Sequence, residues 1–150
     1  MEIIKIYTDG ACRGNPGNGG WGVYILNGEK REEIFGGKTV TTNNEMELTA
    51  SIKGLEYFSN SSKIELFTDS KYVMDGITSW IHNWKKNGWK TASKKPVKNS
   101  SLWTELDKLN SFHDVNWNWV KGHSGDEGND MADKLANQGI CLLYTSDAAD

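Results

Sequence analysis

The sequence of 150 residues has few of the features that mark membrane or disulfide-linked proteins. No apolar run approaches the roughly 20 residues that a membrane-spanning helix needs, which excludes such a helix. The two cysteines, Cys12 and Cys141, are too few for a disulfide framework and form no CxxC pair. No charged and then apolar leader follows Met1, so we expect no secretory signal and a reducing, cytoplasmic setting.

Linkers and low-complexity segments are also missing. The length is that of one ordinary domain. Hydrophobic residues make up 37% and charged residues 25% of the chain, a balance typical of globular rather than disordered proteins. We therefore expect a single domain over residues 1–140.

Acidic residues are absent between residues 76 and 104, although the chain as a whole has a net charge of −3. This stretch holds six lysines, all within residues 80–99, which we call the basic segment. Three of the seven tryptophans lie there too. A lysine run is ordinarily a solvated surface, but tryptophans among the lysines and the lack of acids favour nucleic-acid binding.

The hydrophobic pattern predicts an α/β fold. Three strands joined by short turns come first, with Asn27-Gly28 as a hairpin signal. The glycine-rich residues 10–20 are expected to form a loop. Helix–strand alternation then predicts a mixed five-stranded sheet, three antiparallel strands followed by two parallel ones, flanked by helices. The expected strands are 2–8, 21–26, 30–39, 63–69 and 115–120. The expected helices are 43–59, one from residue 70 through the basic segment with a break at 87–88, 100–110 and 128–138.

Two strand ends share one pattern, IYTDG (6–10) and LFTDS (66–70). If the strands are parallel neighbours, ~4.8 Å apart, the carboxylates of Asp9 and Asp69 converge at one edge of the sheet. Close carboxylates repel each other unless a proton or a cation lies between them, and Mg²⁺ prefers oxygen ligands. Alternatively, Asp9 is a turn residue and Asp69 a helix cap, and the pattern alone leaves both interpretations open.

Five blocks follow one another along the chain. They are YTDGACRGNPGNGGWG (7–22), TTNNEMEL (41–48), LFTDSKYV (66–73), WIHNWKKNGWKTASKKPVKN (80–99) and WVKGHSGDEGNDMADKLA (119–136). With these blocks the chain resembles ribonuclease H, type 1, from Met1 to about Gln138. The resemblance implies the ribonuclease H-like fold and hydrolysis of the RNA strand of RNA/DNA hybrids with two divalent metal ions, leaving 5′-phosphate and 3′-hydroxyl ends.

The resemblance also implies the catalytic residues. It assigns two Mg²⁺ ions, for which Mn²⁺ can substitute, to four carboxylates, and proton transfer or product release to a histidine. Solvated helix faces for Glu47 and Asp133, and an incidental loop residue for His123, are the alternatives that spacing alone would favour. The implied metal ligands are Asp9, Glu47, Asp69 and Asp133, and the implied histidine is His123.

Substrate-binding residues follow from the same resemblance. Asparagine carries both a donor and an acceptor, which suits the 2′-hydroxyl of RNA. A helix cap for Asn43 and a turn for Asn15 are compatible alternatives. The residues implied for the RNA strand are Asn15, Asn43 and Asn44. Those implied for the DNA strand are Thr42, Trp80, Lys85, Lys86, Lys94, Lys95 and Asn99.

Two positions depart from the family pattern, because Glu45 and Val40 stand where arginines are common. We expect Glu45 to add negative potential near the site and to lower substrate affinity. The main alternative function is a hybrid-binding module of the same fold with weak or no cleavage; an integrase or proofreading exonuclease and a plain divalent-ion binder are others. We expect a monomer with RNA/DNA hybrid as its partner, no obligate protein partner and no membrane.

The last ten residues, CLLYTSDAAD (141–150), share nothing with the family pattern. They resemble a translated sequencing-library adaptor, so we expect a non-native tail and a natural reading that ends near Ile140. Without Asp147 and Asp150 the net charge would be −1, and Cys12 would be the sole thiol.

Overall fold

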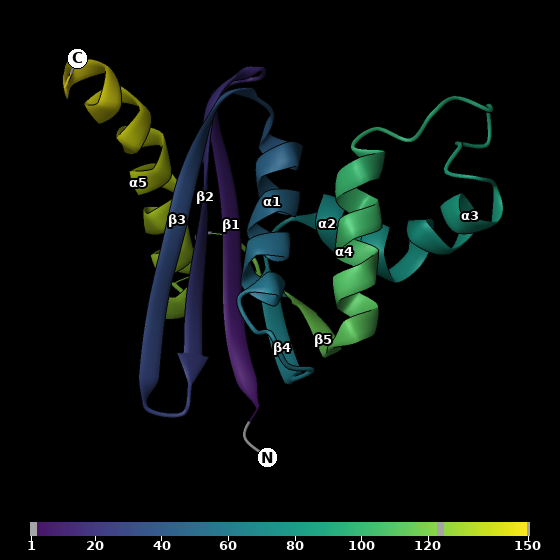
Figure 1. The fold of residues 1–150 in the computed structure, drawn as a ribbon, viewed down its shortest axis with the longest axis horizontal. Helices are drawn as coiled ribbons and strands as arrows, with labels where there is room; N and C mark the ends of the chain where they lie inside the picture. Colours follow the sequence, from purple (N-terminus) through teal and green to yellow (C-terminus); the bar gives the residue numbers. More distant parts are fainter. Residues whose placement is uncertain (1–2, 123–124, 150) are drawn as a thin grey trace.

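In the computed structural model, which describes residues 3–122 and 125–149 and side chains as far as Tyr144, five strands form one mixed sheet (Figure 1). The strand order is β3-β2-β1-β4-β5, with β1, β2 and β3 antiparallel and β1, β4 and β5 parallel. The predicted fold class and strand arrangement are confirmed. The strands are β1 (Ile4–Gly14), β2 (Gly17–Asn27), β3 (Lys30–Thr41), β4 (Lys63–Thr68) and β5 (Asp114–Trp119).

Helices cover both faces of this sheet. Helix α5 packs against the three antiparallel strands on one face, while α1 lies on the opposite face with α4 beside it (Figure 1). Within the described part of the chain, no helix is long and apolar enough to cross a bilayer. The helices are α1 (Asn43–Glu56), α2 (Lys71–Asp75), the π-helical turn η1 (Gly76–Trp80), α3 (Ile81–Lys86), α4 (Ser100–Phe112) and α5 (Glu127–Ala149).

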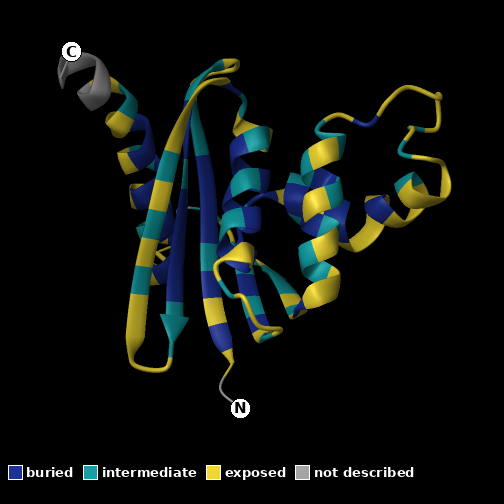
Figure 2. Cartoon of the chain, viewed as in Figure 1, coloured by how far each residue is buried: buried dark blue, intermediate teal, exposed yellow. Residues whose placement is uncertain are grey.

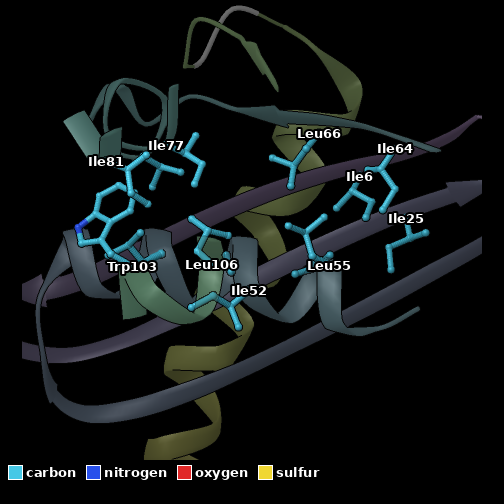
Figure 3. Close-up of a cluster of buried hydrophobic side chains, with 14 of the residues drawn as sticks. Ile6, Ile25, Ile52, Leu55, Ile64, Leu66, Ile77, Ile81, Trp103 and Leu106 are labelled. Carbon is cyan, nitrogen blue, oxygen red and sulfur yellow. The ribbon is translucent and has the colours of Figure 1, made fainter. Parts of the chain in front are cut away.

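The hydrophobic core lies between the sheet and the helices α1 and α4 (Figure 3). Alternate residues of β1 and β4, such as Ile6 and Leu66, are buried in this core, as a period of two residues requires. On α1, Leu48, Ile52 and Leu55 recur at i, i+4 and i+7 and form one buried apolar stripe. The stripe fixes the rotation of α1 about its axis, and with it the direction of the polar residues beside the stripe.

The glycine-rich residues 10–20 are not a loop, and this prediction was wrong. β1 runs to Gly14 and β2 begins at Gly17, so only two residues separate the strands. A Cβ atom on Gly10 would lie 2.4 Å from the backbone nitrogen of Glu47, and one on Gly22 would lie 2.4 Å from the carbonyl oxygen of Ala132. These glycines therefore let α1 and α5 approach the sheet closely, which propensity alone does not reveal.

Several helix boundaries also differ from the prediction. The helix expected from residue 70 through the basic segment is divided into α2, η1 and α3, and the break is confirmed at Asn87 and Gly88. Beyond the break the prediction was wrong, because residues 89–99 are not helical and contain an isolated β-bridge between Lys90 and Pro96. Helix α1 ends at Glu56 rather than residue 59. Helix α5 continues through residues 141–149 instead of ending near 138. That these last residues are a non-native tail stays a prediction.

Candidate active site

Three carboxylates converge where β1 and β4 stop pairing. The parallel ladder ends at the pair Thr8 and Thr68, and an aspartate follows on each strand. One carboxylate oxygen each from Asp9, Asp69 and Glu47 lie within 4.8 Å of one another. The predicted convergence of the two aspartates is confirmed, although β1 itself continues past Asp9 to pair with β2.

Glu47 reaches this cluster because of how α1 begins. Thr42 caps the helix by accepting a hydrogen bond of 3.2 Å from the backbone N–H of Glu45. The helix starts at Asn43, and its second turn passes directly over Gly10, the residue that follows Asp9. Glu47 is only 6% exposed, and its Oε1 atom has no hydrogen-bond partner in the described part of the chain. A buried carboxylate oxygen without a donor requires a cation or a proton.

The electrostatics of the cluster point the same way. Burial and then the negative charge of Asp69 raise the pKa of Asp9 to about 8, and a hydrogen bond involving Asp133 acts in the same direction. Burial, followed by the charges of Asp9 and Asp69, likewise holds the pKa of Glu47 well above its usual range. Without a cation, Asp9 and Glu47 therefore favour their protonated forms over neighbouring negative charges. A hard divalent cation such as Mg²⁺ fits this all-oxygen donor set and would remove the repulsion.

An open cleft of about 400 Å³ lies above the carboxylates. Asp133, one to two turns into α5, completes the acidic wall. Asn43 and Asn44 form the adjacent wall, and the backbone N–H of Asn43 donates to Asn15 Oδ1 at 3.2 Å. The structure thus places Asn43 and Asn44 in the same cleft as the carboxylates, and Asn15 beside Asn43. The residues lining the cleft are Asp9, Gly10, Asn43, Asn44, Glu47, Asp69, Ser70, Lys71, Tyr72 and Asp133.

The loop after β5 approaches Asp69. A Cβ atom on Gly122 would lie 3.0 Å from Asp69 Oδ2. The next residue, the predicted catalytic His123, lies outside the described residues. The helix-cap alternative for Asp69 is wrong, because Ser70 caps α2 by accepting from the backbone N–H of Val73 at 3.2 Å.

Of the other predicted DNA-strand residues, two meet at Tyr72. Asn99 Nδ2 donates to the Tyr72 hydroxyl at 3.2 Å, and the Trp80 ring stands 6.1 Å from the Tyr72 ring. Trp80 is 41% exposed, so part of its surface is free for a ligand. The Trp84 ring packs 5.3 Å from that of the buried Trp103 and belongs to the core beneath the basic segment.

The predicted lysines lie on α3 and on the loop after it, a largely exposed region at the right of Figure 2. Lys85 forms an ion pair of 3.1 Å with Asp107 of α4. Within the described residues, Lys86, Lys94 and Lys95 are exposed and form no ion pair. Three of the four lysines therefore present their charge to solvent, and the fourth is partly neutralised.

Glu45 has both a cationic and a hydroxyl partner. Its carboxylate accepts hydrogen bonds of 2.6 Å from both Lys38 and Thr41, on β3. Despite the opposing effect of partial burial, these bonds hold the pKa of Glu45 below its usual range. Lys38 thus offsets the negative charge of Glu45 locally, and the effect of Glu45 on substrate affinity stays a prediction.

Sequence reasoning missed Lys71 and Trp119 at the edge of the cleft. Lys71 lines the cleft, and its ammonium lies over the Trp119 ring, 5.1 Å from the ring centre. The position of Lys71, two residues after Asp69, was a usable signal. The contact with Trp119 was not, because it depends on how β5 pairs with β4.

The sequence is similar to those of known proteins along nearly its whole length. A family model described as RNase H matches residues 1–141. A ribonuclease H of Alcanivorax borkumensis is 61% identical over 140 residues, covering 93% of this chain and 93% of that protein. One from Ruthia magnifica is 64% identical over 146 residues, covering 97% of this chain and all of that protein. Ribonuclease HI of Pseudomonas aeruginosa is 56% identical over 142 residues, with coverage of 95% and 96%.

Solved structures agree. The crystal structure of LC9-RNase H1, a type 1 RNase H, superposes with a TM-score of 0.84 at 30% identity, covering 93% of this chain and 72% of that one. RNase H1 from the archaeon Halobacterium salinarum gives a TM-score of 0.70 at 26% identity, with coverage of 94% and 99%. On the family model and on relatives more than half identical over nearly all of its length, the chain belongs to the ribonuclease H family.

Proposed function

We propose that the chain is an endonuclease that hydrolyses the RNA strand of RNA/DNA hybrids and leaves 5′-phosphate and 3′-hydroxyl ends. One observation supports this proposal above the others. The carboxylates of Asp9, Glu47 and Asp69 converge within 4.8 Å beneath an open cleft, with a buried Glu47 oxygen that lacks a partner. A site that concentrates negative charge in this way is suited to cations, and through them to a phosphodiester.

The four acidic residues Asp9, Glu47, Asp69 and Asp133 would hold two Mg²⁺ ions, with Mn²⁺ as a substitute that accepts the same oxygen donors. When bound, the ions would supply Lewis acidity to the attacking water and to the 3′ oxygen that leaves. The protein contributes the positions of these donors. Glu47 is fixed by the packing of α1 on Gly10, and Asp9 and Asp69 are fixed by the paired strands β1 and β4.

His123 is proposed to move a proton during turnover or product release. An imidazole with an ordinary pKa near 6.5 can both accept and give up a proton at neutral pH. Its neighbour Gly122 lies against the Asp69 carboxylate, which supports a place for this loop at the reaction.

Strand discrimination is assigned to the asparagines beside the carboxylates. Asn43 and Asn44 line the same cleft, and Asn15 is tied to Asn43 by a hydrogen bond. Their amides offer both donors and acceptors to a 2′-hydroxyl, which only the RNA strand carries.

The DNA strand is assigned to Thr42, Asn99 and Trp80, together with the lysines of the basic segment. Exposed lysines attract phosphates without regard to sequence. Of the four proposed lysines, Lys85 contributes least, because Asp107 already pairs with it.

We further propose that the protein acts in the cytoplasm as a monomer without an obligate protein partner. One chain carries the carboxylates, the asparagines and the basic segment, so a second copy is not needed to complete the site. The alternative of a hybrid-binding module that does not cut would be favoured by loss of a carboxylate, and all four are present.

The test uses RNA/DNA, RNA/RNA and DNA/DNA duplexes of one sequence, each strand labelled in turn, with Mg²⁺. We expect internal cuts in the RNA strand of the hybrid only. Polynucleotide kinase should label the 5′ end of the downstream RNA product only after phosphatase treatment, because that end carries a phosphate. Binding of the hybrid without cleavage would support the binding-module alternative instead.

A further inference from the structure

Lys71 has an unusual place in this molecule. It is the one cation among the described residues that line the cleft, whose other charged groups are Asp9, Glu47, Asp69 and Asp133. Yet no carboxylate in the described part of the chain lies within ion-pair distance of its ammonium group. The lysines Lys38, Lys53 and Lys85, by contrast, each pair with an acid. An exposed cation at the edge of an acidic cleft is thus left available for another anion.

Trp119 explains why Lys71 stays apart from the carboxylates. The ammonium lies over the indole ring, 5.1 Å from its centre, an arrangement that attracts a cation to the negative face of the ring. The ring is held in turn, because its Nε1–H donates to the backbone carbonyl of Asp69 at 3.3 Å. Pairing of Trp119 with Thr68 across β4 and β5 fixes the same register. The Trp119 ring that contacts Lys71 is therefore fixed at the end of β4, next to Asp69 of the cleft.

We infer that Lys71 binds a backbone phosphate of the cleaved RNA strand, next to the scissile one, and that Trp119 is a positioning residue for it. A lysine offers three donors and a compact charge, which suits phosphate rather than a base edge. The strand follows from location, because Lys71 shares the cleft with the carboxylates whereas the basic segment lies beyond it, on α3 and the loop after it (Figure 1). This inference rests on the proposed function.

The first measurement compares Lys71→Gln, Lys71→Arg and the matched control Lys63→Gln in steady-state cleavage of one hybrid over a series of salt concentrations. Lys63 is exposed at the opposite end of β4. We expect Lys71→Gln to raise KM about three- to tenfold at low salt with kcat changed less than about twofold, and to flatten the salt slope by about one. Lys71→Arg should keep most of the wild-type affinity. KM and slope equal to those of Lys63→Gln would overturn the inference.

Trp119 is tested by replacing the ring with and without another ring. Trp119→Leu should raise KM in the same salt-dependent manner as Lys71→Gln but by less, and Trp119→Phe should restore much of the loss. In the double variant Trp119→Leu/Lys71→Gln the two effects should not add, because the first acts through the second. Full additivity would show that Trp119 does not position Lys71.

The strand is tested with hybrids that carry one uncharged methylphosphonate beside the cleavage site. In the RNA strand, the methylphosphonate should raise the KM of the wild type and change the KM of Lys71→Gln little. In the DNA strand, the same change should affect the KM of both enzymes equally. Equal effects from the RNA strand would overturn the assignment. If the wild-type enzyme cuts no hybrid at all, the proposed function fails instead, so the two failures are distinguishable.

Discussion

The acidic cleft and the basic segment carry opposite charges and are built in opposite ways. The cleft draws Asp9, Glu47, Asp69 and Asp133 from four parts of the chain, and two of these, Asp9 and Glu47, are only 5% and 6% exposed. The basic segment is one continuous stretch whose lysines stand in water around partly buried tryptophans. Charge that is buried must be compensated at a defined place, whereas charge in solvent needs only to be near the ligand. We therefore expect single substitutions in the cleft to lower kcat strongly, and single lysine substitutions in the basic segment to weaken hybrid binding only in small steps.

The largest effect is expected from Asp9→Asn. Removing one carboxylate from the centre of the cluster should lower kcat at least about a thousandfold, corresponding to ~4 kcal/mol, with hybrid binding retained. Cleavage in Mg²⁺ measures it, and Asp114→Asn, an exposed residue at the start of β5, is the control. Residual activity above a tenth of wild type would contradict a central role for Asp9.

His123→Ala should have a smaller effect. A proton shuttle that water can partly replace contributes typically about a hundredfold, so turnover should fall by roughly that factor but stay measurable. The decisive comparison is with Asp9→Asn under the same conditions. Equal residual activities in the two variants would break the proposed ranking.

The cleft should also destabilise the metal-free protein as pH rises. The pKa of Asp9 lies near 8 in the folded chain against 3.8 as its ordinary value, so between these values the folded state holds a proton that the unfolded state has lost. The stabilisation that this proton contributes is complete below pH ~4 and is lost as pH rises through ~8. In EDTA at pH 8, Asp9→Asn should be more stable than wild type by about 2 kcal/mol.

Urea unfolding at pH 5 and pH 8, with EDTA or with Mg²⁺, checks this linkage. At pH 8, Mg²⁺ should reduce the difference in free energy of unfolding between wild type and Asp9→Asn, because a ligand that binds the folded wild type stabilises that state. If the wild-type protein becomes more stable from pH 5 to pH 8 in EDTA, the raised pKa of the cleft carboxylates is contradicted.

The basic segment is probed with the triple variant Lys86→Gln/Lys94→Gln/Lys95→Gln. KM for the hybrid should rise about tenfold at low salt, and the salt slope should fall by about two to three, while kcat stays within about twofold. Lys85→Gln alone should do less than any one of the three, because Asp107 already pairs with Lys85. Lys5→Gln/Lys63→Gln, far from the cleft, is the control, and an equal salt slope in control and triple variant would contradict the assignment.

The smallest effect is expected at Glu45. Because Lys38 and Thr41 both donate to its carboxylate, Glu45→Gln should leave KM within about twofold and cost no more than about 1 kcal/mol of stability. Steady-state cleavage and urea unfolding measure both. A severalfold gain in affinity would show that Glu45 does repel the substrate.

Much of this architecture could be predicted from the sequence, because it follows from local patterns. Alternation located the strands, and the repeated aromatic-Thr-Asp motif placed Asp9 and Asp69 at one edge. Family resemblance was needed for Glu47, for Asp133 and for the substrate-binding residues, because their spacing alone is that of a solvated helix or a turn.

What could not be predicted depends on neighbours that are distant in the sequence. The glycines of residues 10–20 belong to strands because α1 and α5 press against them, and their composition is otherwise that of a loop. The pairs Lys38–Glu45 and Lys85–Asp107 assign partners that charge counting cannot assign. The contact of Lys71 with Trp119 likewise exists only once β4 and β5 are side by side.

The most direct test is cleavage of a labelled RNA/DNA hybrid with Mg²⁺, with Mn²⁺ or with a chelator, by wild type and by Asp9→Asn in parallel. We predict that wild type cuts the RNA strand in either metal and not with the chelator, and that Asp9→Asn binds the hybrid but leaves it essentially intact. No cleavage by wild type in either metal, or undiminished cleavage by Asp9→Asn, would contradict the central claim that the buried carboxylates of this cleft carry the reaction.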